Sequence, residues 1–153
     1  MNNDRFKFRV WNGLEYRYID NVPHLSIGAD GRPYYMTFDP ITGITTPCYF
    51  GREYTVVEQC TGLRDKNGKL IYEGDIVEYR YGDGSGSRWF VLWNDEENRF
   101  MKFHEGDFIR HQKEHPTECA AQTLKRTYAT NISSEYSDVR EIVGDIHEEA
   151  KGE

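Results

Sequence analysis

The sequence has 153 residues, 37% of them hydrophobic and 14% aromatic, with a formal net charge of −7. This length suits one domain, or one domain with a small satellite, and excludes two large domains. No apolar run is long enough to cross a bilayer, and the polar N-terminus lacks the pattern of a signal peptide. We therefore expect a cytoplasmic protein with no membrane association.

The negative charge is concentrated near the C-terminus. Residues 135–153 carry seven acids against Arg140 and Lys151, a net of −5, whereas the rest of the chain carries −2. Residues 1–134 have no continuous row of basic side chains of the kind that binds phosphates. Duplex DNA is therefore not an expected partner.

Residues 5–19 predict a β-hairpin. Phe6, Phe8 and Val10 alternate with basic residues, which places the three apolar side chains on one face of a strand. Asn12-Gly13 suits a type I′ turn, and the alternation of apolar and polar residues resumes after it.

The following stretch, residues 22–50, indicates an irregular meander because turn residues separate its short aromatic and β-branched pieces. Pro33, Pro40 and Pro47 cannot donate to a ladder, so we expect edge strands or loops there. A further strand is expected over Tyr54–Gln59.

The middle of the chain has the strongest strand signals. Gly74-Asp75 precedes an apolar strand over Ile76–Tyr81, a pattern that often begins a strand in small SH3-type barrels. Further strands are expected over Arg88–Trp93 and Arg99–Phe103. Gly82–Ser87 is interpreted as a connection between strands rather than a phosphate loop, because a strand and not a helix follows it.

The helix candidate of the chain is Thr117–Tyr128, where Ala120, Ala121 and Leu124 lie near one face. A last strand is expected over Arg140–Ile146.

These elements predict a mainly β protein built as one compact unit. Residues 1–60 form an N-terminal β extension of hairpin plus meander, and residues 61–147 form a small SH3-like β-barrel with one short helix inserted near 117–128. Residues 148–153 form an acidic tail.

The phrase from Gln59 to Val77, QCTGLRDKNGKLIYEGDIV, resembles the signature of the YopX family, which is encoded by phages, prophages and mobile elements. Weaker matches are the opening Phe6–Trp11 and the closing Ile142–Glu148, so the resemblance covers most of the chain. The sequence departs from the family pattern at Cys60, where Tyr or Phe is usual, and at Asp145, where Asn is common.

The resemblance implies a cytoplasmic accessory protein in a host bacterial cell and no established reaction or cofactor. The segment of residues 104–131 is longer than the corresponding segment usual in the family, so the resemblance implies no role for it. We interpret the signature residues as structural: Thr61, Gly62, Leu63, Asp65, Gly68, Tyr72, Gly74, Asp75 and Val77. Asp75 is expected to accept backbone donors within its turn.

Five side chains of metal-ligand type stand in the C-terminal half: His104, His111, His115, Cys119 and His147. Three of them recur at every fourth residue, which would align them on one continuous helix. Pro116 disrupts such a helix, so we interpret the histidines as surface residues and predict no metal and no cofactor. Whether the five converge in space stays open.

No catalytic motif is present, so we predict a protein that is not an enzyme. Aromatic and basic residues around one expected hairpin form a possible surface for a protein partner or for nucleic acid: Tyr79, Arg80, Tyr81, Arg88, Trp89 and Trp93. The leading hypothesis is a non-enzymatic binding module for a protein partner or for self-assembly. The alternatives are a single-stranded nucleic-acid-binding β-barrel, which the near-neutral body disfavours, and a hydrolase with an unrecognised site.

Overall fold

The computed structural model describes residues 3–15, 17–19, 24–51, 53–117, 123 and 127–147. The strands are β1 (Phe8–Asn12), β2 (Arg17–Tyr18), β3 (Ser26–Ile27), β4 (Pro33–Phe38), β5 (Thr45–Tyr49), β6 (Thr55–Arg64), β7 (Leu70–Tyr72), β8 (Asp75–Arg80), β9 (Gly86–Asn94), β10 (Arg99–His104), β11 (Ala129–Asn131) and β12 (Arg140–Asp145). The helices are α1 (Glu105–Glu114) and the 3-10 turns η1 (Asp4–Phe6) and η2 (Ser134–Tyr136). The chain divides into two compact units, one of residues 8–59 and one of residues 1–7 with 60–153.

In the unit of residues 8–59, β1 pairs antiparallel with β2 and with the first half of β6. Val10 and Trp11 are buried, and the Trp11 ring packs edge-on against Tyr18 with 5.1 Å between centroids. The buried Glu58 carboxylate accepts hydrogen bonds from Arg9 Nε at 2.6 Å and from the Tyr18 hydroxyl at 3.0 Å. The predicted N-terminal hairpin is therefore confirmed.

Two details of that hairpin prediction are wrong. Phe6 lies in η1 and is 63% exposed, because the chain turns there and becomes extended only at Lys7. The turn is not type I′: the Asn12 side chain accepts the Leu14 N–H at 3.0 Å, and the Gly13 N–H donates to the Tyr54 carbonyl at 2.6 Å. This side-chain turn leads into a longer loop before Arg17, which pairs with Asn12.

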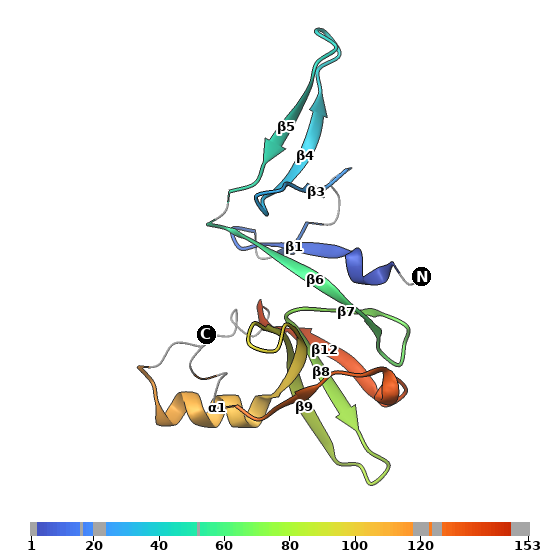
Figure 1. The fold of residues 1–153 in the computed structure, drawn as a ribbon, viewed down its shortest axis with the longest axis vertical. Helices are drawn as coiled ribbons and strands as arrows, with labels where there is room; N and C mark the ends of the chain where they lie inside the picture. The colour runs from blue at the N-terminus through green and yellow to red at the C-terminus, as the bar shows by residue number, and fades with distance from the viewer. Residues whose placement is uncertain are drawn as a thin grey trace. The chain divides into compact units, whose positions relative to one another are not determined.

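The strands β3, β4 and β5 form a separate antiparallel sheet in that order, in which β4 and β5 make a hairpin (Figure 1). The expected edge or loop position is confirmed for Pro40 and Pro47. It is wrong for Pro33, which lies in the central strand β4, where a proline is tolerated because it is the first residue of the strand. Pro33 begins β4, Pro47 lies in the edge strand β5, and Pro40 lies in the turn between them.

In the other unit, five antiparallel strands form a sheet in the order β11-β10-β9-β8-β12. The strands predicted around β8, β9, β10 and β12 are confirmed. The connection predicted over residues 82–87 is confirmed for residues 82–85, whereas Gly86 and Ser87 already belong to β9 and pair with Arg80 and Tyr79. Both faces of this sheet are buried. Face A carries the core residues Val77, Tyr79, Trp89 and Val91 with Ile71, and face B carries Ile76, Phe90, Met101 and Phe103.

This sheet is a half-barrel, and an SH3-like closed barrel is not confirmed. Its edge strands are β11 and β12, and no pairing joins them within the described residues. Closure is not needed to bury either face. Leu63 and Ile132 pack on the face A core, and Phe108 of α1 packs on the face B core. The mainly β class with one helix is confirmed.

The helix α1 was not predicted. Only Phe108 and Ile109 are apolar among its ten residues, so it has no 3.6-residue periodicity to detect. It begins where the His104 side chain accepts the Asp107 N–H. The helix expected at 117–128 falls largely on residues 118–122 and 124–126, which lie outside the described part of the chain. Within the described part, no helix is long and apolar enough to span a membrane.

Candidate functional site

The signature residue Asp65 connects two elements that are distant in sequence. Its buried carboxylate accepts the N–H groups of Asn67 and Lys69, each at 2.9 Å, through Oδ1. Through Oδ2 it accepts the Ile142 N–H of β12 at 3.2 Å. One carboxylate thus closes the turn at Gly68, where φ is +79°, and ties this turn to the edge of the half-barrel.

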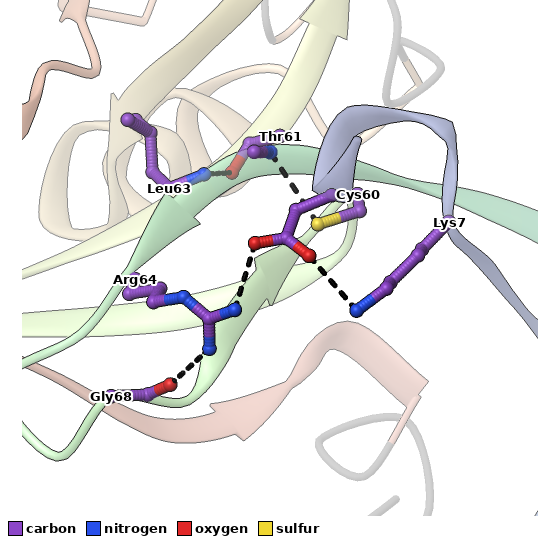
Figure 2. Close-up of polar contacts among 8 residues, drawn as sticks. Lys7, Cys60, Thr61, Leu63, Arg64 and Gly68 are labelled. Carbon is purple, nitrogen blue, oxygen red and sulfur yellow. Dashed lines mark hydrogen bonds and ion pairs between the residues drawn. The ribbon is translucent and has the colours of Figure 1, made fainter. Parts of the chain in front are cut away.

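The residues before this turn form an irregularity in β6, whose pairing with β7 shifts register between Cys60 and Arg64. Gly62 takes a φ of +81°, a backbone conformation that favours glycine. The Thr61 hydroxyl donates to the Ile71 carbonyl at 2.8 Å. It also accepts the Leu63 N–H at 3.1 Å (Figure 2). The bulge is therefore stabilised by its own side chains.

Charged groups hold the same segment to the start of the chain. Lys7 Nζ lies 2.8 Å from Asp4 Oδ1, and Arg64 Nη2 lies 2.7 Å from Asp4 Oδ2 (Figure 2). Arg64 also donates to the Gly68 carbonyl at 2.7 Å. The hydrogen bond with Lys7, and then that with Arg64, hold the pKa of the Asp4 carboxyl below its ordinary value.

The structural role predicted for Asp75 is confirmed, because its Oδ2 accepts the Tyr72 N–H at 2.8 Å. Gly74 beside it has a φ of +85°, donates to the Val91 carbonyl at 2.7 Å and accepts the Ile146 N–H at 2.9 Å. The signature segment therefore holds strands together by backbone and turn contacts.

The surface expected around the β8–β9 hairpin is not one surface. Tyr79 and Trp89 are buried on face A, at 2% and 8% exposure, so they are not available to a partner as surface residues. Tyr81 and Trp93 are exposed, and the Trp93 ring packs edge-on against Phe100. Strand alternation places Arg80 and Arg88 on the opposite face from Tyr79 and Trp89.

Arg80 and Arg88 line a polar cleft of about 520 Å³ together with Glu78, His104 and Glu105. Arg80 Nε lies 2.6 Å from Glu78 Oε2, and Arg88 Nη1 lies 3.1 Å from Glu105 Oε1. Each guanidinium therefore faces a carboxylate, which weakens the attraction of the cleft for phosphates. The His104 Nδ1 accepts the Asp107 N–H at 3.3 Å, so this imidazole serves as the helix cap.

The buried face A carries a cluster of cations and rings. The Lys102 ammonium lies 3.9 Å from the Tyr79 ring centroid, 4.8 Å from Trp89 and 5.9 Å from Tyr136. Arg140 is fully buried and donates to the Arg64 carbonyl through Nε and Nη2 at 3.1 and 2.8 Å, and to the Ser133 carbonyl. Burial raises the pKa of the Tyr79 phenol.

A second candidate surface is the hairpin of β4, β5 and their turn, residues 33–49, which we call the arm (Figure 1). Every residue from 36 to 47 is exposed. The large apolar side chains among the exposed residues of the arm are Met36, Phe38, Ile41, Ile44 and Tyr49. The arm contains a single charged residue, Asp39, in a protein of net charge −7.

The structure also bears on the five side chains of metal-ligand type. In the described ranges, no group of three or more His, Cys, Asp or Glu side chains could hold a metal ion. His111 lies within α1, and His115 is its C-cap. Cys119 lies outside the described residues, so the question of its convergence with the histidines is not tested.

The fold and these surfaces define a mainly β protein with a half-barrel, in which Asp65, Thr61 and Asp75 of the signature accept or donate backbone hydrogen bonds. A family model described as YopX protein matches residues 7–151, and the chain therefore belongs to the YopX family. No curated protein matches the chain. A solved structure, protein EF1440 from Enterococcus faecalis, is similar over 95% of each chain, with 24% identity and a TM-score of 0.50. This likeness supports the fold alone.

Sequence reasoning missed both Lys102 and the arm. Lys102 alternates between Met101 and Phe103 in a strand, which is the ordinary pattern of a solvent-facing residue. For the arm a signal exists: residues 33–49 combine aromatic and branched side chains with a single charge.

Proposed function

We propose that this YopX-family protein is a non-enzymatic accessory protein that self-associates through the arm. The observation that carries the proposal is the exposure of the arm's apolar residues: Ile41 is 94% exposed, Phe38 64% and Ile44 59%. With Met36 and Tyr49, the exposed apolar surface amounts to roughly 500–600 Å², at the upper end of the largest patches on monomers.

The arm favours contact through a face rather than through its edge. The register places Tyr34, Met36 and Phe38 on one face with Pro47 and Tyr49, whereas Thr37 and Thr46 lie on the other. The pairs Asp39–Ile44 and Pro33–Phe50 are hydrogen-bonded, so alternation directs the backbone of residue 47 toward the open edge. Proline has no N–H there, which disfavours addition of another strand along β5.

The uncharged surface of the arm and the area that it exposes both favour a second copy of this chain as the binding partner. Two chains of net charge −7 repel each other least where the surface is uncharged, and the arm supplies such a surface. Packing two arm faces together would bury about 1,000–1,200 Å² in total, the lower end of specific interfaces. We therefore expect a reversible dimer of moderate affinity.

Light scattering over a range of concentrations tests this proposal. The wild-type mass should rise toward twice that of one chain, and the variant Phe38→Asp, Ile41→Asp should stay monomeric. Thr46→Asp adds one negative charge on the opposite face of the arm and should still dimerise. A wild-type protein that stays monomeric, or an equal loss in Thr46→Asp, overturns the proposal.

A further inference from the structure

Two cations lie near each other on face A, and within the described part of the chain neither has a carboxylate partner. Arg140 is completely buried, and its hydrogen bonds to Arg64 and Ser133 go to neutral carbonyl groups. Lys102 is half-buried, and its ammonium makes no hydrogen bond or ion pair with any residue that the structure describes. Buried positive charge is usually balanced by a negative group, so this part of face A has an excess of positive charge.

The aromatic rings around Lys102 compensate for only part of this charge. Tyr79 and Trp89 stabilise the ammonium through their ring faces at 3.9 and 4.8 Å, but ring faces leave its three N–H donors without strong acceptors. Tyr136, with its centroid 5.9 Å from the ammonium, is 50% exposed, so it forms the solvent-facing side of the cluster.

We propose that Lys102 binds a small oxyanion, a carboxylate or a phosphate, on face A, with Arg140 adding a second positive charge and Tyr136 flanking the site. Three of the five N–H donors of Arg140 are bonded to carbonyls and the side chain is fully buried, so the half-buried Lys102 makes the direct hydrogen bonds to the anion. This site belongs to the half-barrel unit and does not depend on the arm.

The electrostatics of Lys102 agree with this assignment. Burial lowers the pKa of the Lys102 amine below its ordinary value, and the Arg140 guanidinium lowers it further. A bound anion reverses both effects, because a negative charge favours the protonated amine. Binding should therefore raise the pKa of Lys102, a response that a purely structural lysine would not show.

Nuclear magnetic resonance of lysine side chains tests the proposal directly. Isotope-labelled protein is titrated with acetate and, separately, with inorganic phosphate, at constant ionic strength maintained with chloride. The Lys102 signal should shift saturably, with a Kd on the order of 1 mM, and its pKa should rise. The anion that binds more tightly identifies the ligand class, carboxylate or phosphate.

Matched variants assign the effect to the site. Lys102→Met should weaken binding at least about tenfold, whereas Lys69→Met removes an exposed lysine and should leave binding unchanged. Lys102→Arg keeps the charge and should retain binding. Shifts at Lys102 that do not saturate, or that match those of other lysines, overturn the proposal. The wild-type signal decides this even if Lys102→Met does not fold.

Discussion

Replacing Asp65 with alanine should lower the free energy of unfolding by about 3–5 kcal/mol, because three backbone N–H groups lose their acceptor. The N–H groups of Asn67 and Lys69 lie in an exposed turn, where water replaces part of the loss. The N–H of Ile142 faces a buried carboxylate and contributes most, about 1–3 kcal/mol. Asp65→Asn keeps one acceptor oxygen and should cost less, about 1–2 kcal/mol.

Urea unfolding followed by tryptophan fluorescence measures this change, since Trp89 lies in the face A core. Asp83→Ala is the matched control. Asp83 also accepts two hydrogen bonds, from the N–H and hydroxyl of Ser85, but in an exposed turn, so its loss should cost under about 1 kcal/mol. An Asp65→Ala protein as stable as Asp83→Ala would refute the structural role of the signature.

Three further predictions concern the half-barrel unit. Gly62→Ala should cost about 1–2 kcal/mol because φ is +81°, whereas Gly82→Ala, with open space around it, should be nearly neutral. Arg140→Met should cost about 2–4 kcal/mol in urea unfolding, against under about 1 kcal/mol for the exposed Arg80→Met. The pKa of Lys102 is lowered by burial, so the unfolded chain holds its proton to higher pH. Wild type should therefore gain stability relative to Lys102→Met as pH rises toward 10.5, and the opposite slope would show that the rings outweigh burial.

Strand positions could be predicted from the sequence because alternation and turn residues are local signals. Ile76 and Val77 both became buried, on opposite faces, since the half-barrel is covered on each side. The same fact explains why a closed barrel was predicted. A strand has the same pattern of apolar residues in a closed barrel and in an open sheet that is covered on both faces. The helix α1 was not predicted, because a single residue, Phe108, makes its contact with the core and one residue gives no helical periodicity.

The candidate sites depend on contacts between distant segments, which spacing does not encode. Lys102 meets Tyr79 and Tyr136 only through the strand order β10-β9-β8 and the segment before β12. Tyr79 and Trp89 were predicted as surface candidates because alternation does not say which face of a strand is covered. Asp75 was predictable, since its role lies within a single turn.

Amide resonances recorded at two protein concentrations, one dilute and one well above the expected dimer Kd, test self-association through the arm most directly. Concentration-dependent shifts confined to the arm, strongest around Phe38 and Ile41 and absent in Phe38→Asp, Ile41→Asp, are the expected result. Shifts centred on another segment, or none in the arm, would contradict the account.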